Sequence, residues 1–346
     1  MFPLRDVMDL SNRHYYANNP VIGSKGDFIT APEISQIFGE IVALWVLLSC
    51  EKIQCNHPTI VELGPGRGTL MQDMIRTFQK SAPLLFNDFQ PKIVLVDSSP
   101  SLQKQQKETL KDCSYSLYFS STIPFDEGAL QNPTFFIANE FFDALPVQQY
   151  IYHNKQWHEV FLGFGEEIST ISEIIGKKAK RLLRPTTLPF DWGFERTVEE
   201  GAVLEYSKDS IAIAHSISQH LKAYGGGGLI IDYGDNTPFP RFGDTLQSVK
   251  NHAYVNPFDH IGTADWTYHV DFSRLCTLFQ KNNLSCTFEN QQSFLKRHGF
   301  DARLEILLKN CATRQEHDDA FLRAHRLVNS KDMGELFKVL SVIKSP

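Results

Sequence analysis

The sequence predicts an α/β fold in which a Rossmann-like sheet carries helices on both faces and a second lobe is inserted after the fourth strand. A short apolar run at 60–63 is followed by three glycines at alternate positions and then by apolar residues at helical spacing, a pattern typical of strand, tight turn and helix. Further apolar runs at 93–96, 134–138 and 229–231 each end in an acid or an amide. This alternation predicts a largely parallel sheet whose strand ends carry polar groups.

The glycine turn predicts a cofactor site. Its pattern is Glu62-x-Gly64-x-Gly66-x-Gly68, and Thr69 stands where a dinucleotide fingerprint would need its third glycine. Glycine lets the backbone approach a ligand where a Cβ would clash. Glu62 would repel phosphates, but it suits a ligand with an ammonium and a sulfonium. We therefore predict S-adenosyl-L-methionine as cofactor; the alternative is a turn that only connects strand to helix.

Length, composition and charge exclude several classes of protein. The chain has 346 residues, of which 42% are hydrophobic and 21% charged, so it is long enough for a large core. Its net charge of −6 argues against a mainly electrostatic nucleic-acid binder, although a local basic patch stays open. Six cysteines without metal-ligand spacing indicate free thiols in a reducing compartment. No signal peptide starts the chain, and the longest apolar run, 41–48, is too short to span a bilayer, so we expect a soluble intracellular protein without stable membrane insertion.

The segment before the glycine turn divides into a loop and a helix. Residues 1–32 are polar and predict a loop, which serves either as a binding lid or as a packing arm. A single helix is predicted from Ala31, with Pro32 and Glu33 in its first turn.

Two strand ends supply candidate site residues. Asp97 follows the second strand, where a carboxylate can accept hydrogen bonds from ribose hydroxyls, although a helix N-cap is the alternative. A third strand is expected to end near Ser120. Asn139, Glu140 and Asp143 follow the fourth strand and would face the methyl donor, although Asn139 and Asp143 could instead cap a following helix.

The second half of the chain predicts a lobe and covering helices. Residues 147–157 predict a hairpin, and the charge run 177–181 predicts a solvated helix face rather than a binding patch. A helix over 211–221 should stop at the glycine run 225–228 before a fifth strand. If 266–272 is extended, His269 and Asp271 share one face of the strand. These two residues then either bind a substrate or have only a structural role. The tail 291–343 has helical periodicity and predicts covering helices.

Several motifs together resemble the MidA family. They are the stretch from Gly26 to Glu40, the glycine turn, Asn139 to Pro146, Ile231 to Gly234, Gly262 to Phe272 and Met333 to Lys338. The family comprises class I methyltransferases and includes a mitochondrial complex I assembly factor, so the resemblance implies S-adenosyl-L-methionine and a protein arginine acceptor. Two departures from the family are expected. The chain is expected to lack the leading helix that relatives carry before the tyrosine pair, and Asn290-Gln291-Gln292 replaces a Thr-Gln element.

The resemblance also assigns residues. We expect Glu62, Gly64, Gly66, Gly68, Asp97, Ser98, Gly26, Asp27 and Thr30 at the cofactor, and Glu33, Asp265, His269 and Asp271 at the substrate. Glu140, Asp143 and Asn139 are the expected catalytic residues, because paired carboxylates can hold a guanidinium bidentately. No metal is expected, since a sulfonium is already an activated methyl donor.

The expected organisation is an N-terminal lid and helix (1–58), a cofactor-binding core (59–146), an inserted substrate lobe (147–205) and a remainder of the core with covering helices (206–346). Three hypotheses stay open: a protein methyltransferase, a methyltransferase on a small molecule or another nitrogen or oxygen, and a non-catalytic assembly factor. A protein substrate, possibly a complex I subunit, is expected in the cytoplasm or the mitochondrial matrix. The acceptor's identity, the degree of methylation and the oligomeric state are left open.

Overall fold

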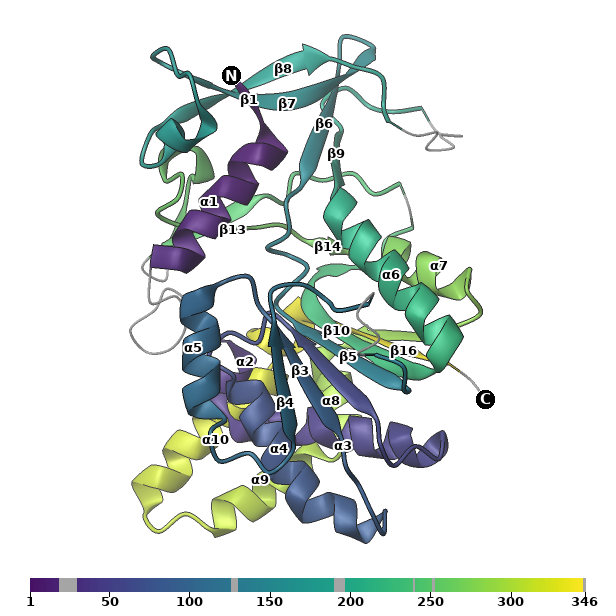
Figure 1. Ribbon diagram of the computed structural model, residues 1–346. Helices are drawn as coiled ribbons and strands as arrows, with labels where there is room; N and C mark the ends of the chain where they lie inside the picture. Colours follow the sequence, from purple (N-terminus) through teal and green to yellow (C-terminus); the bar gives the residue numbers. More distant parts are fainter. Residues whose placement is uncertain (19–29, 126–129, 190–196, 239, 251–252, 345–346) are drawn as a thin grey trace.

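The computed structural model describes residues 1–18, 30–125, 130–189, 197–238, 240–250 and 253–344. These residues form a helix-covered core and a smaller lobe built on strands (Figure 1). Among them, no helix combines the length and the apolar character needed to cross a membrane.

The described part of the core contains an eight-stranded sheet with the order β15-β16-β10-β5-β2-β3-β4, and β14 pairs with β10. Its strands are β2 (Thr59–Leu63), β3 (Lys92–Val96), β4 (Ser116–Ser120), β5 (Thr134–Asn139), β10 (Gly226–Asp235), β14 (Val270–Asp271), β15 (Ser285–Asn290) and β16 (Phe337–Ile343). The five strands from β4 to β10 run parallel, whereas β16 runs antiparallel to both of its neighbours. The carboxyl ends of β2, β3 and β5 therefore lie together, as the apolar runs predicted.

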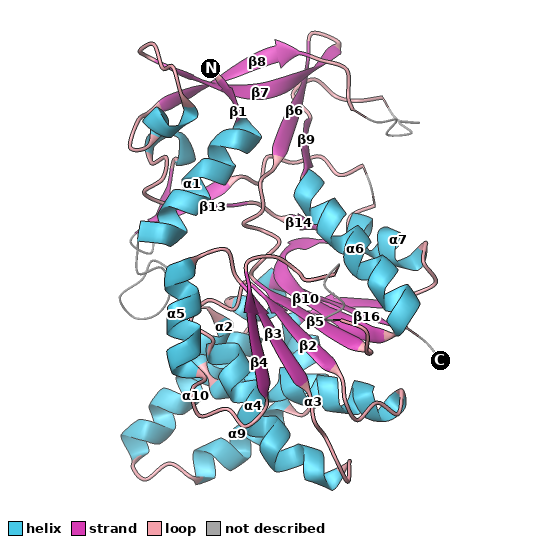
Figure 2. Ribbon diagram, viewed as in Figure 1, coloured by secondary structure: helices cyan, strands magenta, loops and turns pink. Residues whose placement is uncertain are grey.

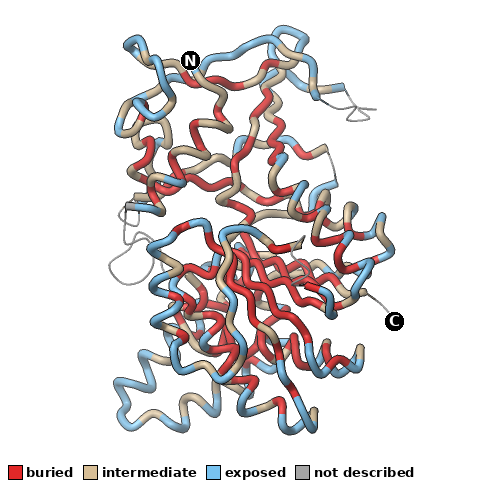
Figure 3. The backbone as a smooth tube through the Cα atoms, in the orientation of Figure 1, coloured by how far each residue is buried: buried red, intermediate tan, exposed pale blue. Residues whose placement is uncertain are grey.

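Helices cover both faces of this sheet, and the strands between them are buried (Figures 2 and 3). One face packs against α2 (Ala31–Ile34), α3 (Gln36–Lys52), α4 (Thr69–Ser81), α8 (Gln291–Arg297), α9 (Phe300–Lys309), α10 (Arg314–Val328) and α11 (Met333–Leu336). The other face packs against α6 (Lys208–Tyr224) and α7 (Phe272–Gln280). A further helix, α5 (Pro100–Thr109), follows β3, and η1 (Ala82–Leu84) follows α4. This is the predicted α/β fold.

The smaller lobe contains a five-stranded and a three-stranded sheet among the described residues. Its elements are β1 (Phe2–Pro3), α1 (Leu4–Asn18), β6 (Gln148–His153), β7 (Gln156–Phe164), η2 (Ile171–Ile174), β8 (Ala179–Pro185), β9 (Val203–Tyr206), β11 (Gln247–Lys250), β12 (Ala253–Val255), η3 (Pro257–Asp259) and β13 (Asp265–Thr267). Leu4, Val7 and Met8 of α1 share one buried cluster with Val160 and Trp266. The lobe therefore joins the first residues of the chain to segments far along the sequence.

Two predictions about the N-terminal half are wrong. Residues 4–18 form a helix instead of a loop, because Leu4, Val7, Met8 and Tyr15 recur at helical spacing and bury one face. The helix predicted from Ala31 is broken at Ser35, which is extended and accepts a hydrogen bond from the backbone N–H of Ile37 as the N-cap of α3.

Two predictions about later segments are also wrong. The charge run 177–181 leads into the strand β8 and not into a helix, because β8 pairs with β7 through Lys180 and Arg181. The end of the tail is strand β16, inserted between β10 and β15, where Val339, Leu340 and Val342 are fully buried. Of the glycine run, Gly225 ends α6 and the next three residues belong to β10.

The glycine run gives a test of the packing between β10 and β5. A Cβ at Gly226 would lie 2.1 Å from the backbone oxygen of Thr134, whereas a Cβ at Gly225 would meet nothing within 4 Å. Both residues have positive φ angles of 104° and 81°, so alanine is strained at either position, by about 1–3 kcal/mol. We predict that Gly225→Ala lowers the free energy of unfolding by that amount and that Gly226→Ala lowers it much further, as measured by urea denaturation. Equal losses would show that β5 can move away from β10.

Candidate active site

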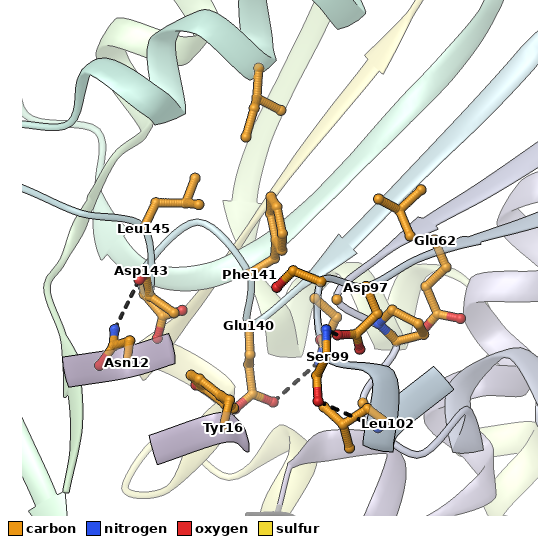
Figure 4. A pocket seen from close by; sticks show the side chains of 18 of the residues that line it. Asn12, Tyr16, Glu62, Asp97, Ser99, Leu102, Glu140, Phe141, Asp143 and Leu145 are labelled. Atoms are coloured by element: carbon orange, nitrogen blue, oxygen red, sulfur yellow. Dashed lines mark hydrogen bonds between the residues drawn. The ribbon is translucent and has the colours of Figure 1, made fainter. Parts of the chain in front are cut away.

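A cavity of about 1060 Å³ opens at the carboxyl ends of β2, β3 and β5. Its walls come from the glycine turn, the ends of β3 and β5, α1, the first turns of α6, and Asp265 of β13. Figure 4 shows the carboxylates of Glu62, Asp97, Glu140 and Asp143 around this space. The strand ends thus bring together acids that lie far apart in the sequence.

The glycine turn needs glycine at the predicted positions. Gly64, Gly66 and Gly68 have φ angles of +63°, +53° and +85°, in the left-handed region that side chains disfavour. A Cβ at Gly64 would also lie 2.9 Å from Cδ2 of Phe141, which follows Glu140. Gly64 and Gly66 line the cavity, whereas Gly68 does not and instead starts α4. The turn therefore contacts the loop that carries the predicted acceptor residues.

Glu62 is a buried carboxylate that faces the cavity from β2. Its side chain is 3% exposed, and Oε2 has no hydrogen-bond partner among the described residues. Burial, together with the negative charge of Asp97, raises the pKa of Glu62 to about 8. A positively charged ligand group would supply the missing partner and favour the ionised form.

Asp97 lies at the end of β3, as predicted. Its Oδ1 accepts the backbone N–H of Ser99 at 2.8 Å, and its Oδ2 accepts from Nε2 of Gln106 at 2.9 Å. Burial raises the pKa of Asp97, although these two hydrogen bonds oppose the shift. The residue that caps α5 is Ser99 and not Asp97. Ser98, between them, is exposed at the cavity edge.

Glu140 holds a strained position on the opposite side of the cavity. Its φ of +50° is uncommon for a residue with a side chain and costs about 1–3 kcal/mol. Oε1 accepts the backbone N–H of Ala31 at 3.3 Å and Nδ2 of Asn139 at 3.2 Å. Burial and the neighbouring Asp143 raise the pKa of Glu140 to about 8. Strain that persists at a cavity wall is typical of a functional residue.

A second acidic pair lies beside Glu140. Asp143 and Asp265 are 3% and 4% exposed, and Tyr16 of α1 hydrogen-bonds to Asp265. Burial and repulsion from Asp265 raise the pKa of Asp143 to about 8. No helix follows β5, so the expected alternative that Asn139 and Asp143 cap one is wrong. Asn139 and Glu140 instead end the strand at the cavity.

The remaining predicted residues divide into three groups. Thr30 and Glu33 line the cavity, but Glu33 contacts the donor side, where its Oε1 accepts from Oγ1 of Thr69 at 2.5 Å. His269 and Asp271 do not line it; Oδ1 of Asp271 accepts the backbone N–H of Arg274 at 3.0 Å and caps α7. The expected polar row is therefore broken where α7 begins. Gly26 and Asp27 lie outside the described residues.

Sequence reasoning missed two residues that the structure places at this site. Tyr16 lines the cavity, and the helical spacing of α1 could have placed it there. Asp232 lies in β10 directly behind the loop after β5, and its signal was an acid that follows the apolar run 229–231. The described residues contain no group of His, Cys, Asp and Glu suited to a metal ion.

Comparison with known proteins identifies the kind of enzyme. The model of a family of S-adenosyl-L-methionine-dependent methyltransferases matches residues 40–289. The chain belongs to this family. It is 31% identical to the human protein named protein arginine methyltransferase NDUFAF7, mitochondrial, over 361 aligned residues that cover 98% of this chain and 78% of the relative. The rat protein of the same name is 32% identical, with coverages of 98% and 79%.

A solved structure supports the fold of this methyltransferase. A Burkholderia thailandensis protein, crystallised with S-adenosyl-homocysteine, superposes with a TM-score of 0.78 at 22% identity, covering 99% of this chain and 87% of that one. The predicted class I methyltransferase fold is therefore confirmed.

The residues around the cavity fit S-adenosyl-L-methionine as cofactor. Glu62 offers an unpartnered buried carboxylate oxygen to an ammonium group, and the positive φ angles of Gly64 and Gly66 keep Cβ atoms out of the turn. Asp97 is suited to two ribose hydroxyls, because a carboxylate accepts several hydrogen bonds at once. We propose that these four residues bind the donor, and Thr30 and Ser98 also line the cavity.

Asp97→Ala tests this assignment. Loss of a charged hydrogen-bond acceptor is expected to cost about 1.5–3 kcal/mol, which weakens donor affinity roughly ten- to hundredfold. Titration calorimetry with S-adenosyl-homocysteine measures the change, with Asp209→Ala as control, because the carboxylate of Asp209 in α6 pairs with Arg5 of α1. An unchanged dissociation constant together with a large fall in melting temperature would leave Asp97 a purely structural role.

The raised pKa values of Glu140 and Asp143 give a pH dependence of stability. Both are about 8 in the folded chain, above ordinary values of 4.5 and 3.8, so the folded state retains protons that the unfolded state releases. The contribution of these two groups is therefore present at low pH and is lost as pH rises from about 4 to about 8. We predict that the melting temperature of the ligand-free protein falls more steeply over this window than that of Glu140→Gln combined with Asp143→Asn. If the melting temperatures of the two proteins fell equally with pH, the raised pKa values assigned to Glu140 and Asp143 would be contradicted.

Proposed function

We propose that this methyltransferase transfers the methyl group to an arginine side chain of a protein, with Glu140 and Asp143 holding the acceptor. The observation that carries the proposal is the pair of carboxylates that follows β5, of which Asp143 is buried and Glu140 is half-buried. Glu140 and Asp143 face the cavity without an ion pair to any described Lys, Arg or His. A buried carboxylate is costly unless a cation compensates it, so this arrangement favours a cationic acceptor.

The arginines that line the cavity do not supply that cation. Among the described residues, Arg5 pairs with Asp209 at 2.8 Å, Arg13 with Asp9 at 2.9 Å and Arg67 with Glu33 at 3.7 Å. Each is thus engaged by an acid other than Glu140 and Asp143. No arginine of the cavity wall therefore pairs with these two carboxyl groups.

A guanidinium suits this pair better than an ammonium does. It is planar, remains protonated at any working pH and presents five N–H donors, so two carboxylates can hold it from different sides. Glu140 approaches from the strained end of β5, and Asp143 lies beside Asp265 and Tyr16 on the side of the smaller lobe. Held between them, one guanidinium nitrogen can be oriented toward the donor side of the cavity.

The donor supplies a methyl group on a positively charged sulfur. The carboxylates then have two tasks in methyl transfer. They orient the attacking nitrogen, and one of them accepts the proton that this nitrogen loses as its new N–C bond forms and the bond between the methyl carbon and the donor sulfur breaks. Pairing with the guanidinium favours the ionised carboxylates despite their raised pKa, and an ionised carboxylate can take up a proton.

The protein class of the acceptor draws support from the relatives and from the smaller lobe. The human and rat relatives carry the name protein arginine methyltransferase, mitochondrial. In this chain α1 and β13 of the lobe form one wall of the cavity. We further propose that the acceptor belongs to respiratory complex I or its assembly, in the mitochondrial matrix or the bacterial cytoplasm.

Labelling tests the acceptor class. The purified enzyme is incubated with methyl-labelled S-adenosyl-L-methionine in a lysate from cells that lack it, and labelled material is analysed by mass spectrometry. We expect methylated arginine in one or a few proteins. Label confined to small molecules, to lysine or to carboxylates would overturn the proposal while leaving the methyltransferase assignment intact.

Glu140→Gln tests the carboxylate directly. Glutamine keeps the shape and one oxygen but removes the charge, and loss of one partner of a desolvated ion pair costs about 2–5 kcal/mol. We expect the rate of label transfer to fall roughly thirty- to several-thousandfold. Donor affinity should stay near that of the wild type, since Glu62 and Asp97 lie on other strands.

Glu305→Gln is the matched control, because this exposed carboxylate of α9 pairs only with Lys309 in the described structure. It should transfer label at the wild-type rate. A wild-type rate in Glu140→Gln as well would remove Glu140 from the acceptor site.

A further inference from the structure

Three backbone amides of the loop after β5 donate hydrogen bonds to a single carboxylate. The backbone N–H of Glu140 donates to the oxygen of Ile231 at 2.9 Å, in continuation of the pairing between β5 and β10. The next three amides, of Phe141, Phe142 and Asp143, turn away from the ladder, although Phe142 is fully buried and Asp143 is 3% exposed. Buried amides require acceptors.

Asp232 supplies the acceptor for all three. Its Oδ2 accepts the backbone N–H groups of Phe141 at 3.2 Å, Phe142 at 2.9 Å and Asp143 at 3.2 Å. Its Oδ1 accepts the N–H of the following residue, Tyr233, at 3.0 Å. Asp232 itself is fully buried at the carboxyl end of β10, so its side chain is held by the sheet.

These hydrogen bonds constrain the backbone of Glu140 and Asp143, the two residues whose carboxylates face the cavity. Glu140 has its left-handed backbone fixed on one side by Ile231 and on the other by the amides bound to Asp232. Asp143 is itself one of the residues whose amide Asp232 holds. The separation of these two carboxylates therefore depends on Asp232, although Asp232 is not among the residues that line the cavity.

We propose that Asp232 is a positioning residue of the acceptor site, which sets the geometry of Glu140 and Asp143 by binding the backbone between them. This rests on the proposed role of these two carboxylates. The loop returns toward the donor through Phe141, whose ring lies against Gly64, but the donor-side acids belong to β2 and β3. Loss of Asp232 should therefore impair transfer more than donor binding.

Asp232→Ala removes the acceptor for three amides, and Asp232→Asn retains one acceptor oxygen. We expect kcat for label transfer, at saturating donor, to fall about a hundredfold in Asp232→Ala, as displacement of reacting groups by about 1 Å does. The kcat of Asp232→Asn should lie between the kcat of this variant and that of the wild type. In both variants the KM for S-adenosyl-L-methionine should stay within about threefold of the wild-type value.

Hydrogen exchange gives a readout that needs no acceptor. Mass spectrometry of the peptide spanning 140–146 should show faster exchange in both variants, with the rest of the chain close to the wild type. The control is Gln291→Ala, because Gln291 is fully buried and its Nε2 donates to the oxygen of Leu327 at 2.9 Å, in the helical layer outside the cavity. It should lower stability without changing exchange in 140–146 or the transfer rate.

The outcomes separate the possibilities. Unchanged exchange in 140–146, or a rate equal to that of Gln291→Ala, would overturn the proposal, and so would exchange that rises equally throughout the chain. If Asp232→Ala fails to fold, Asp232→Asn decides the question. If the wild-type enzyme methylates no arginine but exchange still rises locally, the proposed function fails while the holding of the loop by Asp232 stands.

Discussion

The structure depends on the burial of several carboxylates around one cavity. Glu62, Asp97, Glu140 and Asp143 are all largely shielded from water, and burial raises the pKa of each. Such an arrangement is unfavourable by itself. It becomes useful when two cations must be brought together, because unit charges about 4 Å apart near a protein surface repel by roughly 4 kcal/mol. A sulfonium donor and the guanidinium acceptor that we propose are such a pair, and the carboxylates would compensate both.

The core and the smaller lobe each supply some of the polar residues around the cavity. The parallel strands supply Glu62, Asp97 and Glu140 from a rigid sheet edge, whereas α1 and β13 bring Tyr16 and Asp265 from the smaller lobe. Asn12 fastens α1 in place: its Nδ2 donates to the oxygens of Ala144 at 3.0 Å and Trp266 at 2.9 Å. The acceptor side of the cavity is therefore assembled from residues 12–16, 140–144 and 265–266. The proposed donor residues thus belong to the sheet of the core, whereas the proposed acceptor residues lie where the core meets the smaller lobe.

Local patterns in the sequence predicted the strands and the turn of the proposed donor half. The strand before Gly64, the glycine turn and the acid after β3 depend on neighbours in the chain, so apolar runs and glycine spacing were enough. The acceptor half was harder, since the proximity of Asp143 to Asp265 and Tyr16 requires the packing of α1 on β13. Helix α1 was missed because the polar residues Ser11 and Asn12 occupy two positions of its buried face. Strand β16 was missed because Phe337–Ile343 follows a helical stretch, and only pairing with β10 and β15 identifies it as a strand. His269 and Asp271 were placed by alternation, which fails where α7 begins.

The central claim is that Glu140 and Asp143 bind the same guanidinium group. A double-mutant cycle on the rate of methyl transfer to arginine tests it most directly, using Glu140→Gln, Asp143→Asn and the two combined, with donor affinity measured for each. If both carboxylates act on the same group, the combined loss of transition-state free energy is smaller than the sum of the single losses by about 0.5–3 kcal/mol. Additive losses, or wild-type rates in the single variants, would contradict the account.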